Sequence, residues 1–215
     1  SGTSAITRAL KVLGVDLGGR LLLAADGDDG DNETGFWEDI DFNGLNIELL
    51  RVIDKDWFYT SPVTQIDLEI LNKQGYFLKA ETLVKEKLKD RTLLGVKDPR
   101  MAKLLPFWKE VFARSDINVN YVLAIRQPLS VVKSIENRGW EGRERLFLLW
   151  LNYVIQSLSL TDSTSRVIVD YDHLVRDSAN ELERMAHSLN LSVDKKELVY
   201  YQSEFLDHDL QHSKY

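Results

Sequence analysis

The sequence has 215 residues, of which 44% are hydrophobic and 28% charged, and its 27 basic and 34 acidic side chains give a formal net charge of −7. This balance is that of a folded globular protein and excludes a disordered chain. The negative net charge argues against a nucleic-acid binder, which needs a basic surface to displace counterions.

No segment of the sequence is apolar over a length that could cross a membrane. The longest apolar run, Leu146 to Leu151, is far shorter than the roughly 20 residues that a bilayer requires. No basic-then-apolar segment opens the chain, and cysteine is absent, which excludes disulfides and thiolate metal sites. We therefore expect no membrane span and a cytoplasmic protein.

The length suits one α/β domain with a full core, and no internal repeat or Pro- or Ser-rich linker divides it. We expect residues 1–215 to form a single domain. In chain order, the spacing of apolar residues predicts a helix around 6–13 that ends at Gly14, a loop over 24–35, helices over 42–53 and 65–88, a strand over 93–97, a helix over 101–112, a strand over 121–125, helices over 128–135 and 146–158, and a strand over 167–169.

Two local signals mark helix starts. Pro128 suits the first helical turn, where its missing N–H costs nothing. Ser178 followed by Glu181 predicts a capping box at the start of the last helix. The alternation of strands and helices predicts an α/β fold with a parallel sheet flanked by helices, in which ligands bind beyond the carboxyl ends of the strands.

The first candidate site is the segment Ser1, Gly2, Thr3 and Ser4 at a helix start. Backbone N–H groups and hydroxyls at such a place can bind an anion, with the helix dipole adding a favourable field. The alternative is a plain Ser/Thr N-cap, which the tetrapeptide alone favours.

The second candidate site is Arg126 at the end of a strand, with Ser130 and Ser134 on successive turns of the next helix. The planar guanidinium of Arg126 suits a phosphate, and Ser134 can add a hydroxyl. A surface arginine and two helix serines are common, so this spacing is weak by itself. Together the two candidates place anion donors on neighbouring edges of one sheet, as a bisphosphorylated nucleotide requires.

Five segments in chain order resemble those of nucleotide-dependent sulfotransferases, in particular the carbohydrate-type bacterial branch. They are Ser1–Ala5 with Thr7–Leu10, Gly35–Glu38, Val96–Arg100, Arg126–Ser134 and Asp170–Leu174. Each segment is modest, but their shared order spans nearly the whole chain. The resemblance implies a P-loop-like nucleotide-binding sulfotransferase fold.

The resemblance also implies a ligand and residue roles. Its donor would be 3′-phosphoadenosine 5′-phosphosulfate, with no metal, and its acceptor a hydroxyl on a small or carbohydrate-like molecule. By the resemblance, Lys97 would stabilise the transferring sulfuryl group and Glu38 would be the general base. It further assigns the 5′-phosphosulfate to Ser1, Gly2, Thr3 and Ser4, and the 3′-phosphate to Arg126 and Ser134.

The chemistry of sulfuryl transfer suits these roles. Attacking and leaving oxygens lie in line, and negative charge spreads onto oxygens, so catalysis needs a donor aimed at that charge and a base for the hydroxyl proton. Lys97 is a compact cation at a predicted strand end; its alternative is a surface lysine paired with an acid. Glu38 could equally be a solvated loop acid, and Asp39, Asp41 and the four histidines are its competitors.

Two departures from the family matter. The family's 5′-phosphosulfate loop has a strand and a few residues, usually including a basic one, before the position of Ser1, so we expect upstream residues to be missing from the sequence. No Arg-Lys-Gly segment near the C-terminus matches the nucleotide clamp of the small-molecule cytosolic branch. This places the chain nearer the carbohydrate- or protein-modifying branches.

Several weaker signals have simpler interpretations. The acidic segment from Asp26 to Asp31 lacks the glutamate of a calcium loop, and His208 with His212 has no third metal ligand. The aromatic run 57–59 could line an acceptor cleft or pack in the core. Residues 139–145 could be a loop that closes over the nucleotide or a solvated turn.

Two other functions compete with sulfuryl transfer. A nucleoside-triphosphate kinase would need a Gly-x-x-x-x-Gly-Lys-Ser/Thr loop, and the segment starting at Ser1 shows no lysine before its hydroxyl. A catalytically silent nucleotide-binding or scaffold domain would bind the same nucleotide and transfer nothing.

Overall fold

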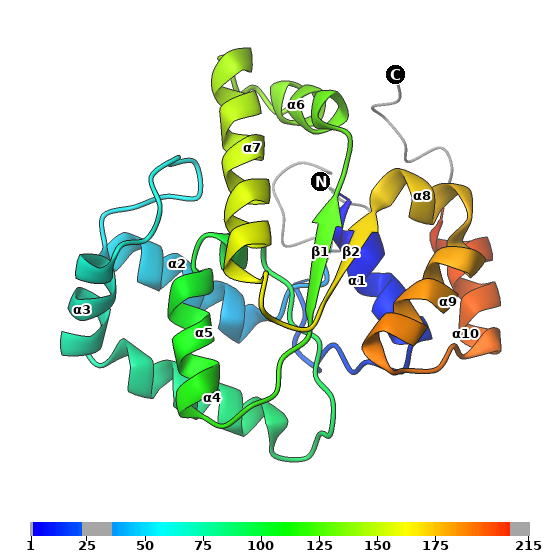
Figure 1. The fold of residues 1–215 in the computed structure, drawn as a ribbon, viewed down its shortest axis with the longest axis horizontal. Helices are drawn as coiled ribbons and strands as arrows, with labels where there is room; N and C mark the ends of the chain where they lie inside the picture. Colours follow the sequence, from blue (N-terminus) through cyan, green and yellow to red (C-terminus); the bar gives the residue numbers. More distant parts are fainter. Residues whose placement is uncertain (1, 23–35, 207–215) are drawn as a thin grey trace. The chain divides into compact units, whose positions relative to one another are not determined.

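The computed structural model describes residues 2–22 and 36–206 (Figure 1). The chain divides into two compact units. We call residues 1–14 and 120–215 the strand unit, because it contains the paired strands, and residues 15–119 the helical unit.

The strand unit is a mixed α/β structure around a small parallel sheet. Strands β1 (Tyr121–Ile125) and β2 (Arg166–Asp170) pair in parallel, with Leu123 opposite Ile168. Its helices are α1 (Thr3–Val12), α6 (Pro128–Glu136), α7 (Arg143–Leu160), α8 (Tyr171–Arg176), α9 (Ser178–Leu189) and α10 (Lys195–Tyr200), followed by the π-helical turn η4 (Tyr201–Phe205). This confirms the expected α/β class with a parallel sheet.

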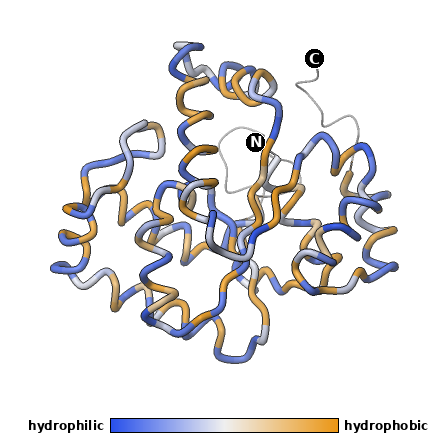
Figure 2. Tube along the Cα trace, viewed as in Figure 1, coloured by the Kyte–Doolittle hydropathy of each residue, from blue (hydrophilic) through white to orange (hydrophobic). Residues whose placement is uncertain are grey.

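Helices pack on the strands of this unit; they bury Val167 and Val169 of β2 and leave the residues of β1 half-buried. Helix α7 packs on β1 and α9 packs on β2, while α1 contacts α8, α10 and η4. Figure 2 shows both strands as hydrophobic over most of their length, and Val167 and Val169 are buried. The carboxyl ends of the strands therefore deliver Arg126 and Tyr171 to the starts of the following helices.

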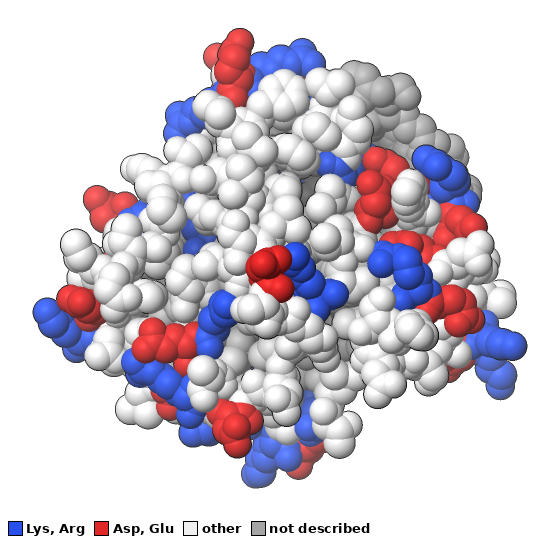
Figure 3. All heavy atoms as spheres, viewed as in Figure 1, with Lys and Arg blue, Asp and Glu red and all other residues white. Residues whose placement is uncertain are grey.

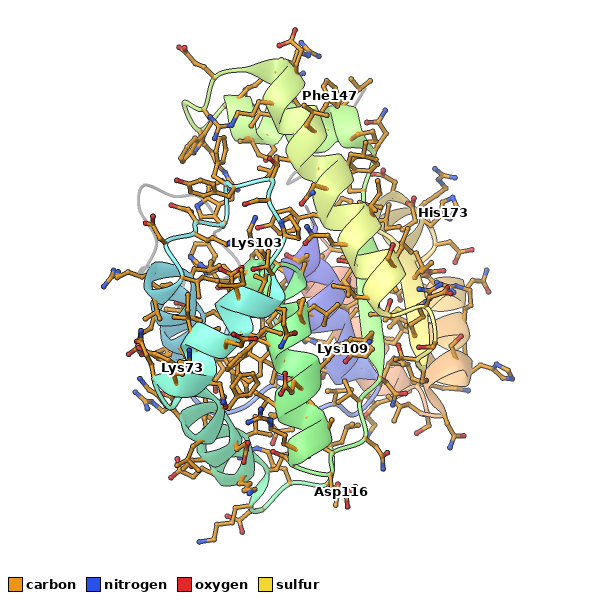
Figure 4. The ribbon with its side chains drawn as sticks, turned by 60° about the vertical axis from the view of Figure 1, so that its left-hand side comes forward. Lys73, Lys103, Lys109, Asp116, Phe147 and His173 are labelled. Atoms are coloured by element: carbon orange, nitrogen blue, oxygen red, sulfur yellow. The ribbon has the colours of Figure 1, made fainter. Side chains whose placement is uncertain are left out.

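The helical unit is built from helices packed around an aromatic core. Its elements are α2 (Ile40–Val52), α3 (Gln65–Lys73), α4 (Tyr76–Leu88), the 3₁₀ helix η3 (Pro99–Ala102) and α5 (Leu105–Arg114), which carries the Lys109 labelled in Figure 4. Trp108 is fully buried, and its Nε1 donates to Asn46 Oδ1 at 2.8 Å. The rings of Phe42 and Phe107 pack against it.

The helix predicted over 65–88 is two helices. Gly75 lies between α3 and α4 with φ of +81°, a left-handed conformation that ends one helix and begins the next. Glycine adopts it without the steric cost that a Cβ brings. The prediction of helical structure from the apolar spacing is confirmed on both sides, and only the break at Gly75 was missed.

The strand predicted over 93–97 is wrong. Among the described residues of this segment, the only pairing is a single parallel bridge between Leu94 and Asp16. The Gly95 N–H donates to the Asp16 carbonyl at 2.7 Å, and a Cβ on Gly95 would lie 2.7 Å from Val15 Cγ1. The two backbones thus approach closely at Gly95, but the described residues of this segment form no continuous ladder of strand hydrogen bonds.

Two predicted helix starts differ from the structure. The helix predicted from Met101 begins at Leu105, so Pro106 lies in its first turn, where a proline is tolerated. In a helix that started at Met101, Pro106 would lie in the interior and would break the helix. The capping box predicted at Ser178 is also wrong. Asp177 is the N-cap of α9, and its carboxylate accepts from the Asn180 N–H.

Helix α7 is longer than predicted. It begins at Arg143, so the C-terminal part of the predicted 139–145 loop is helical. Leu146 and Leu149 are buried, but Leu148 is 59% exposed. In the part of the chain that the structure describes, no helix, α7 included, is both long and apolar enough to span a bilayer.

Candidate functional site

The first turn of α1 begins directly after Gly2, which takes a left-handed conformation with φ of +79°. The Gly2 carbonyl accepts from the Ile6 N–H at 3.2 Å, and Thr7 Oγ1 donates to the Thr3 carbonyl at 2.7 Å. Thr3 and Ser4 are the first two residues of α1 and lie at the positive end of its helix dipole. This turn can therefore hold an anion. Ser1 lies outside the described residues.

Gly2 is pressed against the aromatic ring of Tyr171, the first residue of α8. A Cβ added to Gly2 would lie 2.2 Å from Tyr171 Cδ2 and 2.5 Å from Cγ. Together with the positive φ, this close approach leaves room for glycine alone. The start of α1 therefore lies against the start of α8, the helix that follows β2.

Arg126, which follows β1, lies over the same ring. Its guanidinium carbon is 4.4 Å from the centre of the Tyr171 ring, a cation–π contact. Arg126 Nε is buried and makes no hydrogen bond to any described residue. Ser134 is half-buried on α6, and Ser130, one turn earlier, is buried.

Tyr171 therefore contacts both predicted anion-binding segments, Gly2 from one and Arg126 from the other. Burial raises the pKa of Tyr171, Arg126 opposes the rise and Asp172 adds to it, so the phenol stays neutral over a wide pH range. The sequence marked Tyr171 only as part of a segment at a strand end. No spacing rule could have shown that its ring joins residues more than a hundred positions apart.

In the helical unit, Lys97 and Glu38 form a buried ion pair. Lys97 Nζ lies 2.7 Å from Glu38 Oε1 and also donates to the Phe36 carbonyl at 3.0 Å. Their side chains are only 12% and 7% exposed, respectively. Lys97 is therefore not a surface lysine, and Glu38 is not a solvated acid. The ion pair does match one part of the alternative interpretation of Lys97, in which the lysine pairs with an acid.

Two backbone features aim Glu38 at Lys97. The Leu22 N–H donates to the Glu38 carbonyl at 2.8 Å, within the antiparallel bridge that joins Leu21 to Asp39. Trp37 has φ of +56°, a rare conformation for a bulky residue. This turn brings both the Phe36 carbonyl and the Glu38 carboxylate to Lys97.

A second carboxylate, Asp98, lies beside this pair and is buried. Burial raises the pKa of Asp98, Arg100 lowers it and Glu38 raises it further. Arg100 Nη1 lies 3.2 Å from Asp98 Oδ1 and 4.0 Å from Glu38 Oε2. The site therefore holds two buried carboxylates, the nearly buried Lys97 ammonium and the partly exposed guanidinium of Arg100.

Among the described residues, the competing candidates for the base pair with other groups or are exposed. Asp39 caps α2 by accepting from the Asp41 and Phe42 N–H groups, and Lys87 Nζ lies 2.6 Å from both Asp39 Oδ2 and Asp41 Oδ2. Asp39 therefore has a structural role. His173, labelled on α8 in Figure 4, and His187 are both exposed.

Some predicted features lie outside the described residues. They are Ser1, the whole predicted 24–35 loop with Gly35 and the Asp26–Asp31 segment, His208 and His212. On the face drawn in Figure 3, acidic and basic side chains are interspersed. Specific recognition of an anion would therefore depend on local groups such as Arg126.

The structure thus collects the predicted residues in two groups. Gly2 and Arg126 meet at Tyr171 in the strand unit, with Thr3 and Ser4 directly after Gly2 and Ser134 on the helix that follows Arg126. Lys97 and Glu38 meet in the helical unit.

The chain matches no model of a known protein family and no curated protein. Among solved structures, it is similar to the sulfotransferase domain from the curacin biosynthetic pathway, with 20% sequence identity and a TM-score of 0.48. The similarity covers 75% of this chain and 60% of that domain, so the chain spans less than two thirds of the solved domain's length.

Proposed function

We propose that residues 1–215 form a sulfotransferase domain that moves a sulfuryl group from 3′-phosphoadenosine 5′-phosphosulfate to a hydroxyl on a small, carbohydrate-like acceptor. The observation that carries the proposal is the double contact of Tyr171, with Gly2 on one side and Arg126 on the other. A donor nucleotide with phosphates at both ends needs two anion-binding elements within reach of one ligand. The contacts of Tyr171 support that arrangement.

The nucleotide-binding roles follow from the chemistry of each segment. Ser1, Gly2, Thr3 and Ser4 would hold the 5′-phosphosulfate with their hydroxyls and backbone N–H groups, at the positive end of the α1 helix dipole. Arg126, whose buried Nε makes no hydrogen bond to a described residue, would hold the 3′-phosphate together with the Ser134 hydroxyl.

Lys97 and Glu38 suit the transfer step. The acceptor oxygen attacks sulfur, the bond from sulfur to the bridging phosphate oxygen breaks, and adenosine 3′,5′-bisphosphate leaves. Glu38 takes the hydroxyl proton as general base. The Lys97 ammonium has three N–H donors, of which Glu38 and Phe36 use two, so the third can donate to a sulfuryl oxygen as charge develops.

Nucleotide binding is tested by thermal unfolding with adenosine 3′,5′-bisphosphate, with adenosine as the ligand control. We expect the bisphosphate to raise the melting temperature and Arg126→Ala to abolish most of the rise. Arg176→Ala, which removes an exposed arginine of the same unit, should leave the rise unchanged. An equal rise in Arg126→Ala and the wild type would refute the 3′-phosphate site.

Transfer is tested with labelled donor against a panel of hydroxyl acceptors. Glu38→Gln is expected to lower kcat by about a hundredfold or more, the usual contribution of a general base. A nucleotide-dependent thermal shift with no labelled product in any arm would favour the silent binding domain. Transfer of phosphate from a nucleoside triphosphate, dependent on magnesium, would favour the kinase.

A further inference from the structure

Both carboxylate oxygens of Glu38 have their own hydrogen-bond donor. Lys97 Nζ lies 2.7 Å from Oε1, and Asn43 Nδ2 lies 2.7 Å from Oε2. Arg100 is more distant, at 4.0 Å from Oε2. The Asn43 amide is thus the direct partner of the oxygen that the Lys97 cation does not contact.

The position of Asn43 follows from the start of α2. Asp39 is the N-cap, so Glu38 precedes the cap and Asn43 is the fourth residue of the helix. Side chains at these two positions meet across a helix start, as in the hydrophobic staple. Here the pair is polar, and the Asn43 N–H also donates to the Asp39 carbonyl at 2.9 Å. The helix therefore fixes Asn43 relative to the backbone of Glu38.

We infer that Asn43 is a positioning residue that sets the plane of the Glu38 carboxylate and keeps one lone pair of Oε2 aimed at the acceptor proton. This inference rests on the proposed role of Glu38 as general base. A single contact from Lys97 would leave the carboxylate free to rotate about that bond. The second contact, from a neutral donor on the opposite oxygen, removes this freedom without adding a charge.

A neutral amide also suits the electrostatics of the site. Among the residues that the structure describes, the charged groups that face Glu38 are Lys97, Arg100 and Asp98. A third cation in place of Asn43 would hold the carboxylate more tightly and weaken it as a base, and an anion would repel it. The amide orients Glu38 while leaving the charge balance to the lysine and arginine.

The kinetic test compares Asn43→Ala and Asn43→Asp with Asn72→Asp, which makes the same charge change on α3. We expect Asn43→Ala to lower kcat between about tenfold and a hundredfold, with the KM for the donor nearly unchanged, because the loss is one of orientation. Asn43→Asp sets a second carboxylate beside Glu38, so the two share a proton and the acidic limb of the kcat profile moves to higher pH. Asn72→Asp should move neither quantity.

A binding test separates this inference from the proposed function. Glu38→Ala leaves the buried Lys97 cation without its carboxylate, so formate is expected to occupy the gap and raise the melting temperature. In Glu38→Ala/Asn43→Ala the same formate concentration should give a clearly smaller rise. If Glu38→Ala does not fold, Glu38→Gln with and without Asn43→Ala is compared by kcat, and their kcat values should be equal because no carboxylate remains to be oriented.

The outcomes are distinct. If formate stabilises the protein in a way that depends on Asn43 but no sulfuryl group is transferred, the role of Asn43 in orienting a carboxylate is supported and the proposed function is refuted. Active enzyme whose kcat and pH profile are unchanged in both Asn43 variants would retain the function and refute the positioning role.

Discussion

Gly2 and Tyr171 are in close contact, so that the first turn of α1 packs directly against the start of α8 with no room for a side chain between them. A Cβ on Gly2 would reach 2.2 Å from Tyr171 Cδ2, and Gly2 has φ of +79°. The start of α1, which can hold an anion, therefore contacts the same Tyr171 ring over which the Arg126 guanidinium lies. Any side chain at position 2 must displace the ring, the helix start or both.

Gly2→Ala is therefore expected to abolish the thermal shift produced by adenosine 3′,5′-bisphosphate. Gly14→Ala is the matched control, because Gly14 has φ of +76° but nothing within 4 Å of an added Cβ. Gly14→Ala should cost about 1–2 kcal/mol of stability for its backbone conformation alone and retain the nucleotide shift. An undiminished shift in Gly2→Ala would show that the contact has no part in nucleotide binding.

Tyr171→Leu and Tyr171→Phe separate the ring of Tyr171 from its hydroxyl. The guanidinium of Arg126 lies 4.4 Å from the ring centre, a contact that Phe keeps and Leu loses. We expect Tyr171→Leu to weaken adenosine 3′,5′-bisphosphate binding by about fivefold, which corresponds to roughly 1 kcal/mol. Titration calorimetry measures both variants. Equal weakening in Phe and Leu would assign the effect to the hydroxyl.

The sequence predicted the elements around the proposed nucleotide site more accurately than those around Glu38 and Lys97. Strand β1 and the start of α6 at Pro128 were predicted to the residue, because a short continuous apolar run and a proline leave little choice. The segment before Asp98 was predicted as a strand, since its apolar run looks the same whether or not a neighbour pairs with it. Pairing is set by tertiary contacts such as that of Gly95 with Val15, which no local pattern encodes.

The candidate site shows the same limit. Chemistry and resemblance could suggest Lys97 and Glu38, but the partners that orient them come from folding. Asn43 was not predicted, although its place at the fourth residue of a helix whose cap follows Glu38 is a signal that the sequence carries. It was missed because the helix was predicted to start at Phe42, two residues after its actual first residue, Ile40.

Lys87→Met should destabilise the helical unit far more than Lys79→Met. Lys87 is 15% exposed and pairs with Asp39, whose side chain is 3% exposed, so its loss leaves a buried carboxylate without its cation. We expect a cost of about 3 kcal/mol. Lys79 and its partner Glu48 are both substantially exposed, and losing that pair should cost less than about 1 kcal/mol. Urea unfolding measures both, and similar costs would contradict the structural role of Asp39.

Asp98→Asn should make the protein more stable at neutral pH and reduce the dependence of its stability on pH. Burial, followed by the opposing effect of Arg100 and the repulsion from Glu38, leaves the pKa of Asp98 above its ordinary value. As pH rises above about 4, the unfolded chain releases the Asp98 proton before the folded one does. The folded state then binds more protons, so its stability falls with rising pH until Asp98 ionises in both states.

Asparagine mimics the neutral carboxyl and can still accept the Arg100 N–H, which Asp98 Oδ1 accepts at 2.7 Å. The free energy of unfolding, measured in urea between pH 4 and pH 8, should therefore be higher in Asp98→Asn at the upper end, with the gap closing toward pH 4. Asp98→Ala, which also loses this cap of η3, should be less stable than Asp98→Asn at every pH. A gap of opposite sign that widens with pH would mean that the ion pair with Arg100 outweighs burial.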